Sequence, residues 1–501
     1  MIQLVKKAIK NKDRRAIIAD GQTYSYQELL KESADFAAIL LENAPDLNEM
    51  HVAFIVSPGF DYVRVQWAIW RAGGVAVPLC IGYPLPSLRY MIEDTEAQII
   101  VVGKEYAAIL TPLAKEKGLR FIVLEDTFLE DTFPKVDNFW KGNLPDITPN
   151  RRAMILYTSG TTNLPKGVVT THANIEAQVS TLVKSWQWSA DDHILCILPL
   201  HHVHGIINVI SCALWSGATC EFLPQFTAES VLNAFKKGEI NVFMAVPTIY
   251  FKLIAFIDPL SISEKKALFE VFQRFRLMVS GSAALPVSVM EKWEKISGHR
   301  LLERYGMTEI GMGISNPYDG ERRAGYIGKP LSGVKARLVD EENQVVKRGE
   351  AGEIQIKGKN VFLEYWRKPE ATQKTFTEDG WFKTGDVAVV EQGYYRILGR
   401  DSIDIIKSGG YKISALEIEE ILRTHPSISD CSVVGLPDEE WGEIVAAALV
   451  LTENIEDLSI FNTFLREKMP AYKTPRRYKV VAELPRNAMG KVTKNDLKKV
   501  F

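Results

Sequence analysis

The chain has 501 residues, of which 46% are hydrophobic and 24% charged, and its net charge is -2. These values are typical of a globular protein, and the length predicts about three units of roughly 150 residues or two unequal lobes. A nearly neutral chain without a basic stripe gives no reason to expect a nucleic-acid partner. The longest apolar runs, at 99–102 and 444–451, are shorter than the roughly 18 residues of a membrane span, so no integral membrane contact is expected.

The beginning of the chain, "MIQLVKKAIK", predicts a short amphipathic helix rather than a secretory signal, because it has no long apolar stretch and no cleavage site. The five cysteines show no C-x-x-C pair, which favours reduced, buried thiols and a cytoplasmic location. They are Cys80, Cys196, Cys212, Cys220 and Cys431.

Helical and strand patterns alternate through the first 400 residues. The stretch 25–42 has apolar positions at helical spacing behind Ser25, with Glu28 three places on, which is a capping-box signature. Residues 51–57 and 97–103 read as buried strands, with a helix at 60–74 between them. The pattern predicts an α/β fold with largely parallel sheets covered on both faces.

The pattern changes from about residue 335, where short strands are separated by glycine-rich turns. "KARLVD", "GEIQIKG" and "GYYRILGR" predict a β-rich subdomain that closes the large lobe. The residues that follow mix strands and helices. We therefore predict an N-terminal domain at 1–399 and a small α+β C-terminal domain at 400–501.

"LYTSGTTNLPKG", at 156–167, has the composition of a phosphate-binding loop. A Walker A loop has its glycine before the lysine and leads into a helix, whereas here Lys166 precedes Gly167 and the β-branched "VVTT" follows. The stretch predicts a strand, a loop and a second strand, although a simple turn is the alternative. Backbone N–H groups, hydroxyls and the lysine would hold phosphate. The predicted ligand residues are Thr158, Ser159, Gly160, Thr161, Thr162 and Lys166.

This loop and seven further motifs resemble, in their order, the adenylate-forming superfamily, which includes the acyl-CoA synthetases. An early structural motif lies at 72–103. The others are "LPLHHVHG", "SGSAALP", "ERYGMTE", "GWFKTGD", "GRDSIDIIKSGGYKIS" and "PRNAMGK". The resemblance covers nearly the whole chain. It implies an enzyme that joins a carboxylic acid to AMP, releases pyrophosphate, and passes the acyl group to coenzyme A.

The resemblance implies a role for each motif. Lys491 would bridge the carboxylate and the α-phosphate, Thr308 would donate to that phosphate, and Glu309 would hold Mg²⁺. Asp386 would accept the ribose hydroxyls, with Arg400 nearby at the domain junction. The remaining ATP-binding residues are expected to be Gly281, Ser282, Ala283, Glu303, Arg304, Tyr305, Gly306 and Met307, with Tyr305 stacked on the base.

Three histidines, His201, His202 and His204, bear on the acid. In a strand the last two would face one side, but without a further ligand at metal spacing a zinc site is disfavoured. Aligned on the family pattern, His202 lies near the acyl group, and His204 adds polarity that a fatty-acyl tunnel would lack. Met312 is expected to be a further residue of the acyl site. "HHVHG" and its companion stretches most resemble the malonyl-CoA synthetase branch.

A dicarboxylate needs a cation at the far end of its pocket. Arg276 is the first candidate, because arginine binds a carboxylate through two hydrogen bonds. Arg322 and Arg323 are alternatives. Relatives with other substrates also carry a basic residue before the strand that follows Arg276, so Arg276 could equally have no role in binding a dicarboxylate.

The C-terminal part is expected to rotate about a hinge at 401–403, as in the family, and to bring a glycine-rich face to the thioester site. The residues expected on this coenzyme A face are Ser408, Gly409, Gly410 and Tyr411. Three residues, rather than the family's usual two, separate Arg400 from Asp404. The hinge therefore cannot be assigned to one of them.

The sequence thus predicts a ligase with ATP, Mg²⁺, coenzyme A and a small carboxylic acid, malonate first, working as a monomer or homodimer. A fatty or aryl acid is the alternative within the class. An adenylating protein that loads a carrier protein is another alternative. A non-catalytic relative is disfavoured, because Lys166, Glu309, Asp386, Arg400 and Lys491 are all present.

Overall fold

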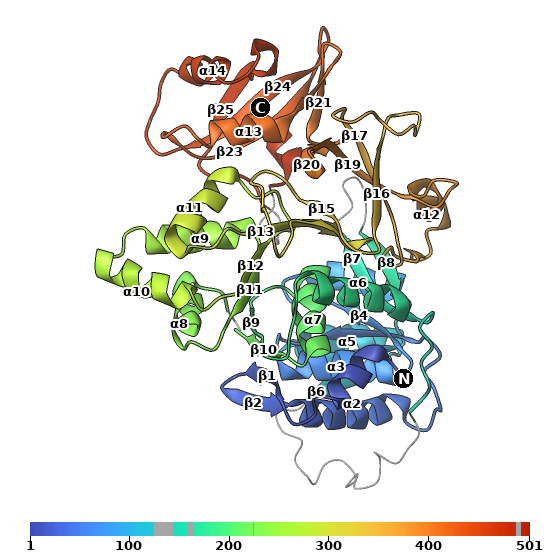
Figure 1. Ribbon diagram of the computed structural model, residues 1–501. Coiled ribbons are helices and arrows are strands. Elements are labelled where there is room, and N and C mark those ends of the chain that lie inside the picture. Colours follow the sequence, from blue (N-terminus) through green and yellow to red (C-terminus); the bar gives the residue numbers. More distant parts are fainter. Residues whose placement is uncertain (125–143, 159–164, 224, 487–491) are drawn as a thin grey trace.

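The computed structural model describes residues 1–124, 144–158, 165–223, 225–486 and 492–501. Two large sheets and their helices form the body of the molecule, which carries the N-terminus (Figure 1). A small antiparallel sheet flanks the body, and the C-terminal unit, in orange and red, lies at the opposite end of the molecule from the N-terminus. The α/β architecture with a separate α+β unit confirms the predicted fold class.

The first helices follow the sequence patterns. Helix α1 spans Gln3–Ile9, and α2 spans Tyr26–Leu41. The Ser25 side chain accepts from the Glu28 amide while the Glu28 carboxylate accepts from the Ser25 amide, so the predicted capping box is present. All five cysteines are buried and unpaired. Within the described residues, no helix is long and apolar enough to cross a membrane.

One large sheet has seven strands and a parallel centre. Helices α3 (Phe60–Arg71), α4 (Leu85–Asp94) and α5 (Lys104–Lys117) connect its strands. The strand order is β18 (Glu364–Tyr365), β8 (Lys166–Thr171), β7 (Arg152–Thr158), β4 (Val75–Pro78), β3 (His51–Ile55), β5 (Ile99–Gly103) and β6 (Arg120–Leu124). The predicted strands at 51–57 and 97–103 and the helix between them are therefore confirmed.

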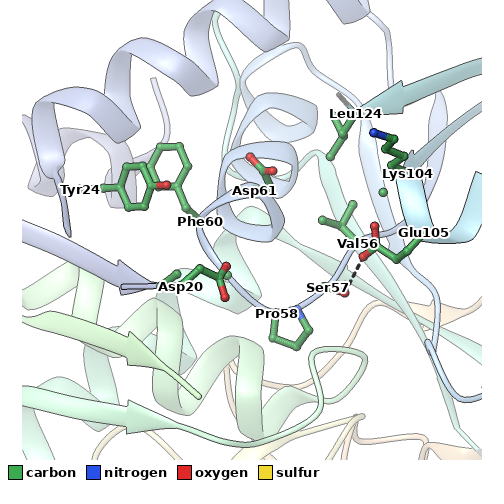
Figure 2. Close-up of a pocket in the computed structure, with 13 residues that line it drawn as sticks. Asp20, Tyr24, Val56, Ser57, Pro58, Phe60, Asp61, Lys104, Glu105 and Leu124 are labelled. Atoms are coloured by element: carbon green, nitrogen blue, oxygen red, sulfur yellow. Dashed lines mark hydrogen bonds between the residues drawn. The ribbon is translucent and has the colours of Figure 1, made fainter. Parts of the chain in front are cut away.

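A hollow of about 240 Å³ lies where β3 and β5 end. Figure 2 shows the Ser57 hydroxyl donating to the Glu105 carboxylate (2.6 Å). Both residues line the hollow, as do Asp20 and Asp61. None of the residues that line it belongs to the site predicted from the sequence.

The second large sheet has nine strands, and its helices include α8 (Ala228–Lys236), α9 (Pro247–Ile257), α10 (Ile262–Phe272) and α11 (Val287–Ser297). Its strand order is β15 (Lys329–Pro330), β14 (Gly311–Ser315), β13 (Leu302–Met307), β12 (Leu277–Ser280), β11 (Val242–Ala245), β9 (His193–Cys196), β10 (Thr219–Phe222), β1 (Arg15–Ala19) and β2 (Gln22–Ser25). Strands β9 to β13 run parallel, so the chain reverses direction at the end of β13.

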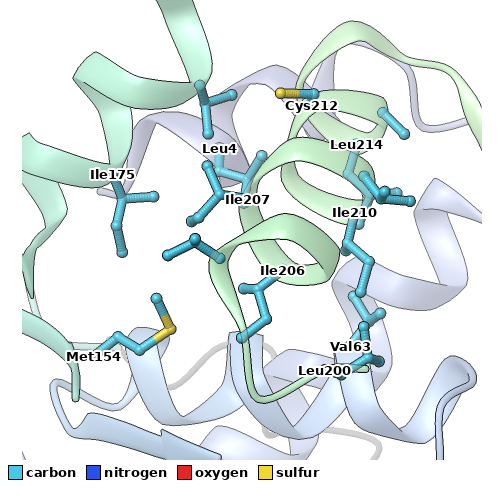
Figure 3. Packing of buried hydrophobic residues seen from close by; sticks show 14 of the residues in the cluster. Leu4, Val63, Met154, Ile175, Leu200, Ile206, Ile207, Ile210, Cys212 and Leu214 are labelled. Atoms are coloured by element: carbon cyan, nitrogen blue, oxygen red, sulfur yellow. The ribbon is translucent and has the colours of Figure 1, made fainter. Parts of the chain in front are cut away.

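A π-helix, η2 (His204–Ser211), continues into α7 (Cys212–Ser216) and lies in the core. Figure 3 shows Ile207 between Leu4 and Ile175 of α6 (His172–Ser185), while Ile206 points toward Met154. Ile206 and Ile207 are at most 1% exposed. Burial of one such side chain contributes roughly 1.5–3 kcal/mol, so η2 is held firmly by its apolar face.

The small sheet is antiparallel and confirms the predicted β-rich subdomain. Its strands are β16 (Lys335–Val339), β17 (Gly352–Lys357), β19 (Phe382–Glu391) and β20 (Tyr394–Arg400), and α12 spans Pro369–Thr375. The C-terminal unit follows directly after β20. It contains β21 (Ile405–Ser408), β22 (Tyr411–Ser414), α13 (Ala415–Leu422), β23 (Ile428–Asp438), β24 (Gly442–Leu451), α14 (Ser459–Arg466), the 3-10 turn η3 (Ala471–Lys473), β25 (Arg477–Val480) and α15 (Lys494–Lys498).

Candidate active site

The phosphate loop joins two antiparallel strands. Thr158 ends β7, Lys166 begins β8, and the two residues pair directly, so the two predicted strands that flank the loop are confirmed. Ser159, Gly160, Thr161 and Thr162 lie outside the described residues. The Lys166 ammonium lies 5.0 Å from the centre of the Tyr365 ring, within cation–π range.

Glu309 lies in the turn between β13 and β14 and is 9% exposed. The Tyr365 hydroxyl donates to its carboxylate (2.8 Å), but burial still raises the pKa of Glu309. A buried carboxylate with so little compensation favours a nearby cation. Tyr365 therefore connects Glu309 to the phosphate-loop lysine. No local pattern predicts this contact, because it is the pairing of β18 with β8 that brings Tyr365 there.

Tyr305, Asp386 and Arg400 come together from three strands. The Tyr305 hydroxyl donates to one Asp386 oxygen (2.6 Å), and the Arg400 Nε donates to the other (3.0 Å). Asp386 and Arg400 are directly opposed in the pairing of β19 with β20. Each carboxylate oxygen has a second acceptor position, so the group retains capacity for ligand hydroxyls.

The segment 281–286 connects β12 to α11 and carries three of the predicted ATP-binding residues. Ser282 has a positive φ of 71°, which a serine rarely adopts, and its hydroxyl lies 3.1 Å from His204 Nδ1. Ala283 follows it. Glu303 Oε1 accepts from the Leu285 amide (3.1 Å). Burial raises the pKa of Glu303 to about 8.

Arg304, on β13, is 3% exposed and packs against the backbone of Gly281. A Cβ on Gly281 would lie 2.5 Å from the guanidinium, so a larger residue there would displace Arg304. Within the described residues, Arg304 Nε and Nη2 have no hydrogen-bond partner. Burial lowers the pKa of Arg304 to about 9, which leaves it positively charged at neutral pH.

The three histidines do not form a strand. His201 and His202 lie in a turn, with ring centres 4.0 Å apart, and His204 begins η2. The expectation that His202 and His204 would face the same side, as they would in a strand, therefore does not apply. His204 is 4% exposed, and burial followed by the charge of Arg304 lowers its pKa well below the usual value. A neutral His204 thus lies close to the Arg304 guanidinium.

Arg276 has a different environment from the one that its proposed role requires. Its guanidinium makes two hydrogen bonds to Asp192 (2.5 and 2.6 Å) and a third to the Trp186 carbonyl (2.9 Å). It also precedes β12, whereas His204 and Ser282 meet beyond the other end of that strand. These contacts do not support the interpretation of Arg276 as the pocket cation, because a buried acid already pairs with it.

The two alternative arginines are also engaged elsewhere. Arg322 donates to the carbonyls of Arg300 (2.8 Å), Tyr318 (3.0 Å) and Pro317 (3.3 Å). Arg323 pairs with Glu321 (2.9 Å) and lies over the Tyr394 ring. Neither arginine faces the group formed by His204, Ser282 and Arg304 in any contact of the described residues.

The β13–β14 hairpin is tightly packed. Gly306 has no room for a side chain, because a Cβ there would lie 2.0 Å from the Gly311 carbonyl and 2.5 Å from Met312 Cε. Met312 is 2% exposed. Met307 ends β13, and Thr308 follows it in the turn that carries Glu309.

The predicted coenzyme A face is a hairpin between β21 and β22. Gly409 and Gly410 form its turn with positive φ values of 56° and 83°, and a Cβ on Gly409 would lie 2.7 Å from the Trp441 ring. Ser408 is buried, whereas Tyr411 is 55% exposed and stacked on Tyr472. Lys491 lies outside the described residues.

The expected hinge residues form a turn after β20. Asp404, just beyond them, accepts from the Arg400 amide (3.0 Å) and pairs with Lys494 (2.6 Å). The junction thus contains an ion pair between a buried lysine and a half-buried aspartate, which the sequence did not indicate.

These features define a nucleotide-binding enzyme of two lobes. A family model described as AMP-binding enzyme matches residues 4–366, and its C-terminal domain model matches residues 417–491. The chain therefore belongs to the AMP-binding enzyme family.

Its relatives include the mitochondrial malonate–CoA ligase ACSF3 of Bos taurus, which is 44% identical over 97% of this chain and 88% of the relative. A malonate–CoA ligase of Arabidopsis thaliana is 38% identical over 97% of this chain and 86% of the relative. Among solved structures, ATP-bound MatB from Rhodopseudomonas palustris is 33% identical with a TM-score of 0.89, covering 100% of this chain and 98% of that chain. Apo MatB from the same organism is 32% identical over the same shares, with a TM-score of 0.80.

Proposed function

We propose that this protein is an ATP-dependent acid:CoA ligase that forms an acyl-adenylate and then an acyl-CoA thioester, with malonate as its acid. Relatives named malonate–CoA ligases, which match 97% of the chain, support this proposal. So does the presence of every residue expected for ATP. The boundary between the two functional units is proposed to lie after residue 399.

The phosphate end of the site would hold MgATP. Glu309, whose carboxylate is buried, would bind Mg²⁺, which would neutralise charge on the phosphates. Lys166 and the loop hydroxyls would contact the departing pyrophosphate. Asp386 would accept the ribose hydroxyls while Arg400 and Tyr305 hold its carboxylate in place. Lys491 is proposed to bridge the α-phosphate and the acid.

The acid end carries the single observation that favours malonate. A fully buried guanidinium with two unpartnered nitrogens is unfavourable unless an anion reaches it. Arg304 lies against Gly281 and close to His204. The distal carboxylate of malonate would bind there through two hydrogen bonds, which an arginine fork suits.

A fatty or aryl acid suits this pocket less well. Besides Arg304, the Ser280 hydroxyl and His204 Nε2 are buried without partners among the described residues. An acyl chain packed against such groups would leave them unsatisfied, at roughly 1–3 kcal/mol each. The carboxylate of a short diacid would accept from them instead.

The test is ATP–pyrophosphate exchange with malonate, methylmalonate, acetate, octanoate and benzoate, followed by transfer to coenzyme A. We expect malonate to exchange fastest. Arg304→Gln should lower kcat/KM for malonate by about 100-fold or more, since truncating a buried charge partner costs roughly 2–5 kcal/mol. Its effect on acetate, which has no second carboxylate, should be less than tenfold.

Arg323→Gln is the matched control, because it removes an equal charge that is paired with Glu321. It should leave the acid preference unchanged. Equal losses for malonate and acetate in Arg304→Gln would refute the malonate pocket. Transfer to a carrier protein but not to free coenzyme A would instead favour the carrier-loading alternative.

The cytoplasmic location predicted from the sequence stays a prediction, and the name of the Bos taurus relative places that protein in mitochondria. A monomer or homodimer likewise remains the expected state. Size-exclusion chromatography with light scattering would decide between the two states.

A further inference from the structure

Helix α13 carries two adjacent glutamates whose contacts lie in different parts of the molecule. Glu419 is 4% exposed and pairs with Lys494 (2.8 Å) and Arg423 (3.2 Å), so it belongs to the interior of the C-terminal unit. Glu420 is the next residue and contacts the large lobe. Neighbours on a helix are about 100° apart, which allows the two carboxylates to serve separate partners.

The Glu420 carboxylate accepts from the Val287 amide of α11 (2.8 Å). Val287 is the first residue of this helix, whose own N-cap is Pro286 and makes no side-chain capping bond. The first N–H groups of a helix have no partner within the helix and carry partial positive charge, so a carboxylate there is stabilising. Glu420 thus caps a helix of the other lobe. The contact is part-buried, and burial raises the pKa of Glu420.

The capped helix is joined directly to the site. Moving back along the chain from Val287, the Leu285 amide donates to Glu303, the Ser282 hydroxyl meets His204, and Gly281 packs on Arg304. A shift at one end of this short segment therefore reaches the groups proposed to bind the acid and the nucleotide. The whole chain also matches ATP-bound MatB better than apo MatB.

We propose that Glu420 is a positioning residue for adenylation. By accepting the Val287 amide, it holds the C-terminal unit against the segment 281–287 while the acyl-adenylate forms. It must release this amide when the C-terminal unit turns toward thioester formation. The proposal rests on the proposed function, because it requires two half-reactions carried out in two arrangements of the lobes.

The test compares the two half-reactions in Glu420→Ala and Glu420→Gln. Adenylation is measured by ATP–pyrophosphate exchange with malonate, and thioester formation by transfer from supplied malonyl-adenylate to coenzyme A. In Glu420→Ala, we expect exchange to fall about tenfold while transfer is unchanged or faster. Glu420→Gln keeps an acceptor oxygen for the amide, so it should restore part of the exchange rate.

Glu417→Gln is the matched control, because it lies on the same helix and pairs with Lys473 within the C-terminal unit (2.7 Å). It should leave the ratio of the two rates unchanged. An equal fall of both rates in Glu420→Ala, or no fall in exchange, would overturn the proposal. If another acid exchanges faster than malonate, the same comparison is made with that acid and its adenylate. A wrong acid assignment therefore leaves this test intact.

Discussion

Arg276 and Arg304 lie near opposite ends of β12, and they differ in what surrounds their charge. Arg276 precedes the strand and has an acid and a carbonyl as partners. Arg304 lies beyond Ser280, the last residue of β12, since Ser280 pairs with Glu303 on β13. It has two guanidinium nitrogens without a partner among the described residues. The buried charge at the amino end of β12 thus has its partners within the protein, whereas the buried charge at the carboxyl end lacks partners among the described residues.

Unpaired buried groups mark the place where a ligand is expected to bind. A buried polar group left unpaired costs roughly 1–3 kcal/mol, and more if it is charged. Such groups persist where a ligand supplies the missing partner. In parallel sheets, ligands bind beyond the carboxyl ends of the strands, which is the end where the unpaired groups gather. Arg276 should therefore serve stability, and Arg304 should serve binding.

Loss of Arg276 should affect stability more strongly than any other change considered for this strand. Arg276→Met should lower the free energy of unfolding by about 3–5 kcal/mol, because it leaves the carboxylate of Asp192 buried without its cation. The Asp192 side chain is 1% exposed. Urea denaturation would measure the change. Activity per folded molecule with malonate should stay near the parent value.

Adding Asp192→Asn to Arg276→Met should recover part of the lost stability, since it removes the unpaired charge. A variant that keeps its stability but loses its preference for malonate would restore Arg276 as the pocket cation. The roles assigned to the two ends of β12 would then be reversed.

Glu303 allows a pH test of the carboxyl end. Its pKa is raised to about 8 in the folded protein by burial, against an ordinary value of 4.5. The unfolded chain therefore loses this proton first, and the stability that protonated Glu303 contributes declines as pH rises from about 4.5 through about 8.

Glu303→Gln keeps a neutral acceptor for the Leu285 amide and removes this dependence. The variant should match the parent near pH 5 and exceed it by roughly 3–4 kcal/mol near pH 8, because each pH unit over which only the folded state keeps the proton is worth about 1.4 kcal/mol. Urea denaturation of the two ligand-free proteins at pH 5 and at pH 8 would measure this difference in stability. Parallel pH curves for the two proteins would mean that Glu303 is ionised in the fold.

Local patterns predicted the elements well, because caps and periodicity act over a few residues. The capping box at Ser25 and the strand after Lys166 are examples. Long-range partners were not predictable in this way. Nothing local to Arg276 indicates that Asp192 occupies it, and nothing local to Glu309 indicates Tyr365. His204 begins a buried helix rather than lying in a strand, and the apolar run after it could not decide between the two, because such a run suits both.

Asn208 gives the smallest and most discriminating test of the comparison. It is fully buried on η2, four residues after His204, so it projects from nearly the same helix face. Both atoms of its amide lack partners among the described residues, as do those of Gln66 on α3.

If Asn208 belongs to the ligand end, Asn208→Leu should stabilise the ligand-free protein by about 1 kcal/mol, because an unsatisfied amide is removed. It should also lower kcat/KM for malonate about fivefold, whereas Gln66→Met should bring the same gain in stability with no change in activity. Thermal unfolding and pyrophosphate exchange would separate the two variants. If both variants keep the parent's activity, Asn208 belongs to the structural core. If both lose activity equally, an unpaired buried amide does not distinguish ligand-binding groups from packing groups in this fold.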